Sequence, residues 1–213
     1  MDEPLSALDR KTKREILPFI EKLRDHFSLP MFYISHDMAE VERLADHVVL
    51  LDKGHMVASA ALSELQSDPS SPLAASREAA VTLKGVLESS DSKFGLANVS
   101  IPGGMLIAPP PPTAAIGELR RIRILASDVS LARERPASSS ILNVLSARIV
   151  SMRPLGQYEA LVVVSLGEKG DGARLLSRMT QKSLAELGLA KGQSVYAQVK
   201  YVSLGPGRGE PEE

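Results

Sequence analysis

The hydrophobic pattern of the chain changes in the stretch from residue 68 to residue 80. Before it, apolar residues recur at helical spacing or form short continuous runs, a pattern typical of an α/β fold. After it, runs of Val, Ile and Leu alternate with Gly, Pro, Ser and Asp over residues 81–204, which predicts short β-strands. The stretch itself contains Asp-Pro-Ser-Ser-Pro, so we predict a linker at 68–80 between an α/β segment at 1–67 and an all-β domain. Gly, Pro and charged residues at 205–213 predict a disordered tail.

The α/β segment has a predictable order of elements. Apolar residues at helical intervals predict an amphipathic helix over about 9–27, and the run at 31–34 is consistent with a buried parallel strand. Asp37, followed three residues later by a glutamate, indicates the start of a second helix. A strand at 47–51 and its hairpin partner at 55–60 follow.

The β region contains a weak internal repeat. Residues Ile122–Leu131 align without gaps on Val195–Leu204, and each segment reads as the last strand of a half. Two related five-stranded barrels of the oligonucleotide/oligosaccharide-binding (OB) type would explain this repeat.

Composition excludes several classes of function. The 25 Lys and Arg nearly balance the 26 Asp and Glu, which argues against non-specific attraction to nucleic acid or an anionic membrane. Aromatic residues make up only 4% and Trp is absent, so a base-stacking surface is not expected. The absence of cysteine excludes disulfides and thiolate metal sites. No run approaches the ~18 apolar residues of a membrane span and no secretory signal is visible, which fits a cytosolic protein.

Two short motifs in the α/β segment carry possible chemistry. The pair Asp2-Glu3 is followed by Pro-Leu-Ser-Ala-Leu-Asp9, and Ile34-Ser-His36-Asp37 ends the next predicted strand, 34 positions from Asp2 to His36. An isolated acidic pair is most often a solvated helix start, and a histidine at a strand end is often structural. Together and in this order, the motifs resemble the Walker B end, the D-loop and the switch histidine of ABC-transporter ATPases.

The resemblance implies a role for each of these residues. Asp2 would help to hold Mg²⁺ through its water shell, and Glu3 would polarise the water that attacks the γ-phosphate of ATP. His36 would contact that phosphate. Asp9 would lie at the dimer interface, where ABC sites form.

The sequence also departs from the ABC pattern. Neither a Gly-x-x-x-x-Gly-Lys-Ser/Thr motif nor a Leu-Ser-Gly-Gly-Gln signature is present, so the phosphate-binding nest and lysine are missing. We therefore expect the 213 residues to correspond to the C-terminal part of a longer ATPase and to be inactive alone. Whether this chain is itself an enzyme stays open.

The β region resembles the TOBE or Mop regulatory domain of molybdate-importer ATPases. The residues that carry this resemblance are Arg121–Leu131, Ser139–Leu145 and Tyr196–Lys200. Molybdate offers only acceptor oxygens, so its site should supply hydroxyl, amide, backbone N–H and cationic donors. The candidate oxyanion-binding residues are Ser139, Ser140, Asn143, Ser183 and Lys200.

These oxyanion candidates have plain alternatives. Lys200 aligns with Ser127 in the repeat, so its charge is special to the second half, yet it could be an ordinary solvent-facing lysine. Ser139 and Ser140 could belong to a simple linker. The family often has Arg before the Asn, where this chain has Leu142, which puts affinity or selectivity in doubt.

The fold class expected is an α/β C-terminal part of an ABC ATPase domain followed by two OB-like TOBE/Mop barrels. The function implied is the ATP-binding subunit of a molybdate importer, for molybdate or tungstate, with ATP and Mg²⁺ used by the full-length protein. The alternatives are a non-enzymatic molybdate-binding module, or an ATPase subunit for sulfate, polyamine or sugar. Implied partners are a membrane permease, through it a periplasmic or extracellular molybdate-binding protein, and a second copy of the chain; no nucleic acid is expected. The implied location is cytoplasmic, peripheral on the inner face of the cell membrane.

Overall fold

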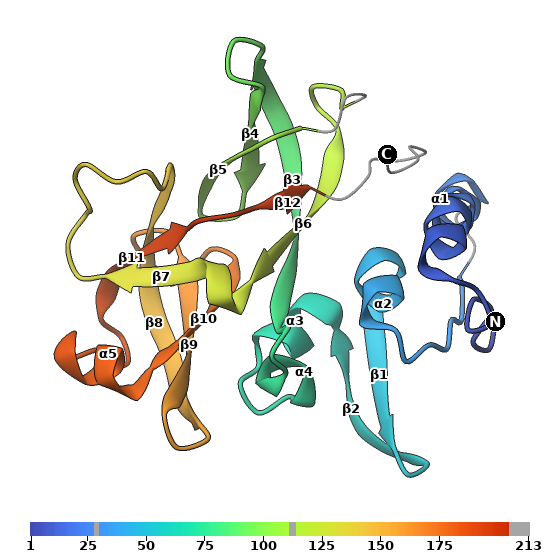
Figure 1. Cartoon of the computed structure of the whole chain (residues 1–213), viewed down its shortest axis with the longest axis horizontal. Coiled ribbons are helices and arrows are strands. Elements are labelled where there is room, and N and C mark those ends of the chain that lie inside the picture. The colour runs from blue at the N-terminus through green and yellow to red at the C-terminus, as the bar shows by residue number, and fades with distance from the viewer. Residues whose placement is uncertain (28–29, 111–113, 205–213) are drawn as a thin grey trace.

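A computed structural model describes residues 1–27, 30–110 and 114–204 (Figure 1). The predicted tail at 205–213 lies outside the described residues. The helices are α1 Arg10–Phe27, α2 Met38–Leu44, α3 Leu62–Ser67, α4 Pro72–Ala75, α5 Gln181–Glu186 and the 3-10 turn η1 Ala126–Asp128. The strands are β1 His47–Asp52, β2 His55–Ala61, β3 Ala80–Asp91, β4 Leu96–Ile101, β5 Gly104–Ala108, β6 Leu119–Leu125, β7 Val129–Ala132, β8 Asn143–Leu155, β9 Glu159–Leu166, β10 Arg174–Thr180, β11 Ser194–Val199 and β12 Ser203–Leu204.

Two curled five-stranded antiparallel sheets make up most of the protein, as expected for OB-like barrels (Figure 1). Barrel 1 has the strand order β12-β6-β3-β4-β5, and barrel 2 has the order β10-β9-β8-β11-β7. In barrel 2 the outer strands β10 and β7 are joined where the Ser177 hydroxyl donates to the Val129 carbonyl at 2.6 Å. The expectation of a mostly β region with OB-like sheets is confirmed.

The two barrels exchange their last strands. After β6 in barrel 1 the chain turns through η1 and enters barrel 2 as β7. After β11 in barrel 2 it crosses back and enters barrel 1 as β12. The two repeated segments, Ile122–Leu131 and Val195–Leu204, are therefore the two that cross between the barrels, so they occupy equivalent places in the fold.

One apolar core runs through both barrels. Its buried residues come from β3, β4 and β6 of barrel 1 and from β8, β9, β10 and β11 of barrel 2. At the seam the backbones meet closely, because Ala173 N–H donates to the Pro102 carbonyl at 2.7 Å. A Cβ on Gly172 would lie only 2.6 Å from the Gly103 Cα, so this contact requires glycine.

The α/β segment has a small core of its own. Leu5, Leu17, Ile20 and Leu44 form a cluster separate from the barrel core. The predicted buried strand at 31–34 is wrong as stated, because only Ile34 bridges, in parallel, to Asp2, and Phe32 is 81% exposed. A parallel strand is buried only when neighbouring strands and helices cover it, and residues 1–2 provide a single short neighbour.

The stretch predicted as a linker is packed against the barrels. It contains α4, and Ala74 and Ala79 are buried in the barrel core. None of the described helices is long and apolar enough to span a membrane.

Candidate functional site

The backbone brings the two N-terminal motifs together. Ile34 N–H donates to the Met1 carbonyl at 2.9 Å, and Glu3 N–H donates to the Ile34 carbonyl at 2.9 Å. These two bonds form the parallel bridge between Asp2 and Ile34. The carboxyl ends of parallel neighbours meet at the same edge, so the acidic pair lies beside the turn that carries His36.

Glu3 and His36 form an ion pair in the structure. His36 Nδ1 lies 2.7 Å from Glu3 Oε1, and both side chains are open to solvent. The hydrogen bond from Glu3, and then its charge, raises the pKa of His36 above the ordinary histidine value. Because folding raises this pKa, the pair stabilises the folded state fully at pH values below the ordinary histidine pKa. This stabilisation is lost as pH rises through the raised pKa.

The backbone at Glu3 is unusual. Its φ is 39°, in the left-handed region that residues other than glycine rarely adopt. Strained backbone of this kind gathers at functional sites, where the surrounding contacts over-determine it. Here the bond from Glu3 N–H to Ile34 and the contact with His36 hold the residue on both sides.

Asp9 lies at the start of α1. Its carboxylate accepts from Thr12 N–H at 2.8 Å, which caps the helix, and this hydrogen bond lowers the pKa of Asp9. The side chain is exposed and none of the described contacts joins it to Asp2, Glu3 or His36. Its predicted place at a dimer interface stays a prediction.

A buried carboxylate behind the His36 turn was missed by the sequence reasoning. Glu40 is only 2% exposed and accepts from the Ser35 hydroxyl at 2.7 Å and the Tyr33 hydroxyl at 2.9 Å. Lys13 from α1 reaches the other oxygen of Glu40 at 2.7 Å and Asp37 at 3.0 Å. Burial raises the pKa of Glu40, but Lys13, Ser35 and Tyr33 together lower it below the ordinary value. The pattern Asp37-x-x-Glu40 looked like a capping box; Asp37 does cap α2, but Glu40 faces inward.

Asn143 connects the two barrels. Its side-chain Oδ1 accepts from Ile107 N–H at 2.6 Å, and its Nδ2 donates to the Ile107 carbonyl at 2.9 Å. It is 6% exposed at the start of β8, while Ile107 lies on β5, the edge strand of barrel 1. One amide hydrogen of Asn143 is left for another acceptor. The main role of this side chain is therefore to satisfy the backbone of Ile107 at the β5 edge of barrel 1.

Lys200 lies close to Asn143 by strand register. Val199, the residue before it, pairs with Asn143 on one side and with Val129 on the other. Lys200 N–H donates to the Asp128 carbonyl at 2.9 Å, and its side chain is exposed. Lys200 therefore sits at the crossing point of the two exchanged segments.

The two serines before Asn143 lie on the exposed loop between β7 and β8. Ser139 Oγ accepts from Ile141 N–H at 3.1 Å, a local turn contact. Ser140 is exposed. Both remain available to a ligand at the Asn143 end of β8.

Ser183 lies elsewhere on the barrel. It is in α5, where the Thr180 hydroxyl accepts from Ser183 N–H at 3.0 Å. Thr180 pairs with Glu159, next to the turn between β8 and β9, whereas Asn143 starts β8 at its other end. Figure 1 shows α5 well away from the crossing of β11 into β12. A single chain thus does not bring Ser183 together with Asn143 and Lys200.

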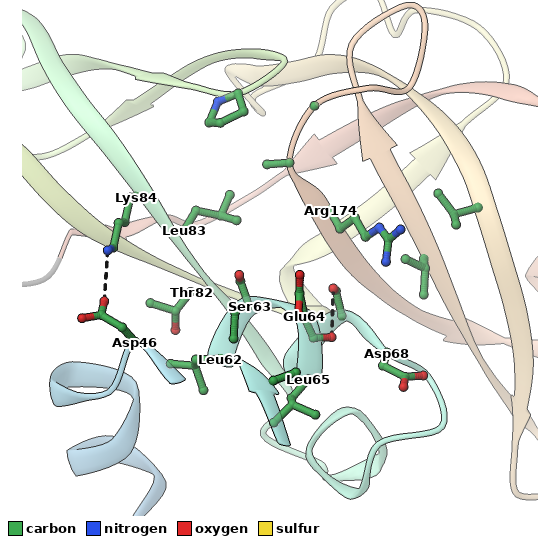
Figure 2. Close-up of a pocket in the computed structure, with 18 of the residues that line it drawn as sticks. Asp46, Leu62, Ser63, Glu64, Leu65, Asp68, Thr82, Leu83, Lys84 and Arg174 are labelled. Atoms are coloured by element: carbon green, nitrogen blue, oxygen red, sulfur yellow. Dashed lines mark hydrogen bonds and ion pairs between the residues drawn. The ribbon is translucent and has the colours of Figure 1, made fainter. Parts of the chain in front are cut away.

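A cleft of about 920 Å³ lies between the α/β segment and the barrels (Figure 2). Its walls include Asp46 and α3 on one side, Lys84 and Arg121 of barrel 1, and Arg174 of barrel 2. None of the predicted site residues lines it. Among the described residues no group of three His, Asp or Glu side chains is placed to hold a metal ion.

Comparisons with known proteins bear on both halves. The TOBE domain family matches residues 139–204. The molybdenum import ATP-binding protein ModC of Rhodopseudomonas palustris strain BisB18 is 59% identical over 98% of this chain and 54% of its own length. ModC of Rhodobacter capsulatus is 41% identical over 96% of this chain and 56% of its own length. The chain thus spans about half the length of these curated relatives.

A solved structure matches more than half of the chain. It is the cytoplasmic molybdate-binding protein ModG, in a form with molybdate bound, and it is 26% identical with a TM-score of 0.50. The match covers 58% of this chain and 94% of that one. The chain is therefore a homologue of the molybdenum import ATP-binding proteins over almost its whole length, and it carries a TOBE domain at residues 139–204.

Proposed function

We propose that the chain is the C-terminal half of the ATP-binding subunit of an ABC importer for molybdate, joined to a domain that binds the oxyanion. The observation that carries this proposal is the meeting of Glu3 and His36 across a parallel backbone bridge, in a homologue of molybdenum import ATP-binding proteins. ATP hydrolysis is a reaction of the longer protein in this proposal, because the phosphate-binding lysine and the signature motif are not in the 213 residues.

In the nucleotide site each residue has a separate task. Mg²⁺, when bound, neutralises charge on the phosphates; it prefers one or two carboxylates with waters and phosphate oxygens as its other ligands, so a single Asp2 fits it. Glu3 would orient and polarise the attacking water, which is why its left-handed backbone and its link to Ile34 matter. His36 would contact the γ-phosphate, and Asp9 would lie at the boundary with a second subunit.

Exposed apolar side chains support the proposal of a larger ATPase domain. Phe32 is 81% exposed, Leu51 and Met56 are each 67% exposed, and Ile34 is 50% exposed. Ile34 forms the parallel bridge to Asp2, and parallel α/β sheets bury such side chains on both faces, whereas Leu51 and Met56 pair across the antiparallel hairpin β1–β2, one face of which needs cover. We infer that the part of the ATPase present in the longer relatives covers them.

The barrels would hold the oxyanion. A molybdate-binding protein aligns over almost its whole length with more of this chain than the α/β segment contains, which supports binding by the barrels. Val199, the residue before Lys200, pairs with Asn143, and Ser139 and Ser140 precede Asn143 in the chain. In this proposal the lysine and the two hydroxyls supply the donors that a tetrahedral dianion needs. Ser183 lies away from them, which favours a site completed by a second chain and hence a homodimer. Molybdate and tungstate have the same charge and shape, so both are expected to bind.

The importer implied by this assignment has further parts. A membrane permease would dock on the ATPase half at the cytoplasmic face of the membrane. A molybdate-binding protein outside the cell membrane would deliver the ion through that permease.

Replacing Lys200 with methionine is expected to weaken molybdate binding by about tenfold or more, because a hydrogen bond to a charged group contributes about 1.5–3 kcal/mol. Isothermal titration calorimetry of the 213-residue chain measures this. Lys191→Met is the matched control: Lys191 is an exposed lysine in the turn before β11, and its loss should leave the affinity unchanged. Equal affinities of the Lys200→Met variant and the wild type would show that Lys200 does not bind molybdate and is an ordinary surface lysine.

A further inference from the structure

The helix that follows His36 is held by two buried carboxylates on opposite sides. Glu40 and Glu42 are two positions apart on α2, which places their side chains about 200° apart around the helix. They are 2% and 8% exposed. Glu40 faces the α/β segment, where it is bound by Lys13, Tyr33 and Ser35. Glu42 faces the barrels.

Glu42 connects α2 to strands of barrel 1. Its Oε2 accepts from Arg123 Nε on β6 at 2.6 Å, and its Oε1 accepts from Gln66 Nε2 at 3.0 Å. Gln66 is only 2% exposed and is itself bound to barrel 1, because its Oε1 accepts from Thr82 N–H on β3 at 2.7 Å. The carboxylate is therefore bound on both oxygens by groups fixed to the barrel or to α3.

The carboxyl end of α2 is held to the same strand. Arg121, also on β6, donates to the Ala45 carbonyl at 2.8 Å and to Asp46 at 2.9 Å. Lys84 on β3 reaches the same Asp46 carboxylate at 3.0 Å, as Figure 2 shows at the rim of the cleft. The Lys84–Asp46 pair is exposed, whereas Glu42 is buried.

Because α2 is short, its position depends on the contacts that it makes with its neighbours. A helix of seven residues is far too short to be stable alone in water, so its position is set by what binds it. His36 directly precedes Asp37, the residue that caps α2. On the other side α2 is held to α1, where Arg43 pairs with Glu21 and Arg24 donates to the Leu44 carbonyl at 2.7 Å. We therefore expect that loss of the contacts with β6 shifts α2 toward α1, and with it the His36 turn relative to Glu3.

We propose that Glu42, held by Arg123, is a positioning residue for His36, and that the barrel thereby fixes the orientation of the histidine in the nucleotide site. This inference rests on the proposed function, since it assumes that the Glu3–His36 pair belongs to that site. Strand β6 continues through η1 to Asp128, whose carbonyl binds Lys200 N–H. The contacts of α2 with β6 therefore connect the His36 turn to the strand that leads to Lys200, one of the oxyanion candidates.

Several charged groups surround His36 and Glu42, the two side chains that this inference connects. His36 faces Glu3, with Asp37 and Lys13 acting through their charges. Glu42 faces Arg123 and Gln66, with Glu78 acting through its charge. Burial raises the pKa of Glu42 and Arg123 opposes that rise. The charges that shift the pKa of His36 are those of Glu3, Lys13 and Asp37, so we attribute a response of the histidine to replacement of Glu42 or Arg123 to the position of α2.

The test is an NMR titration of His36 in the 213-residue chain, with its signal assigned by comparison with a His36→Gln variant. Glu42→Gln and Arg123→Met are each expected to lower the pKa of His36 toward the ordinary value by about 0.3 unit or more, a twofold change in its proton affinity. The double variant should lower the pKa no further than the stronger single variant, because the two residues act as one pair. Arg123→Lys should restore part of the difference.

Two further variants separate the possible outcomes. Glu3→Gln measures how far the pKa of His36 falls when the ion pair is lost. Lys84→Met is the control: the Lys84–Asp46 pair is exposed and weak, and Arg121 still holds Ala45 and Asp46, so the pKa of His36 should stay unchanged. If Glu3→Gln lowers the pKa of His36 but Glu42→Gln and Arg123→Met do not, the positioning role is wrong and the nucleotide site stands. If Glu3→Gln also leaves it unchanged, the Glu3–His36 pair is absent, and both the proposed site and this inference are overturned. Thermal unfolding of each variant confirms that the folded state is being titrated, and Arg123→Lys keeps the test decisive if Glu42→Gln does not fold.

Discussion

Replacing Glu3 with glutamine should reduce ATP hydrolysis by about 100-fold or more in an assembled ATPase, because a positioned general base contributes about 10²–10⁴-fold to such reactions. The assembled protein is a fusion in which the preceding residues of the Rhodopseudomonas palustris BisB18 relative are joined to this chain, a design supported by 59% identity over 208 residues. Glutamine keeps the size of Glu3 and can still contact His36, but it cannot accept the proton of the attacking water. The measurement is steady-state kcat for phosphate release.

The control for this experiment is Glu15→Gln. Glu15 is an exposed acid on α1, so its replacement makes the same chemical change without touching the nucleotide site. The Glu15→Gln fusion should retain the full rate. A Glu3→Gln fusion as active as its parent would show that Glu3 is not the base, and would leave the acidic pair as a solvated turn.

Replacing Asn143 with alanine should lower the free energy of unfolding by about 3 kcal/mol. The change removes both partners of the Ile107 backbone, and each buried polar group left unsatisfied costs about 1–3 kcal/mol. Because Asn143 joins β8 of barrel 2 to the edge strand of barrel 1, the loss falls on the seam between the barrels. Urea unfolding followed by circular dichroism measures the difference.

Asn98→Ala is the matched control for the seam. Among the described residues, Asn98 donates one side-chain hydrogen bond, to the Ser89 hydroxyl at 2.9 Å within barrel 1, so its loss should cost about 0.5–1.5 kcal/mol. Equal costs for Asn143→Ala and Asn98→Ala would mean that solvent readily replaces the Ile107 contacts, and that Asn143 does not hold the barrels together.

Local pattern predicted the elements well. The helical spacing before Phe27 predicted α1, which spans Arg10–Phe27, and the alternating runs after residue 80 predicted the strands of both barrels except β7 and β12. The repeat predicted two related halves, but the prediction that each repeated segment is the last strand of one half is wrong, because each segment runs from one sheet into the other. These features depend on residues close together in sequence, where spacing alone decides which face is buried.

Long-range pairing could not be predicted from these patterns. Nothing local distinguishes a β7 that pairs within its own half from one that crosses to the other barrel. The two hydrogen bonds from Asn143 to Ile107 join residues 36 positions apart, and Glu42 and Arg123 are 81 apart. For the candidate site, the motif predicted that Glu3 and His36 belong together, but not the ion pair itself or the buried Glu40 behind it.

If this chain is the oxyanion-binding half of a molybdate-importer ATPase, as we propose, the backbone amide NMR spectrum of the chain titrated with sodium molybdate should show it most directly. We expect saturable shifts at Ser139, Ser140, Asn143, Ser183 and Lys200, similar shifts with tungstate, and no such shifts with sodium chloride at the same ionic strength. An unchanged spectrum of the folded chain at saturating molybdate, or shifts confined to the cleft around Arg174, would contradict it.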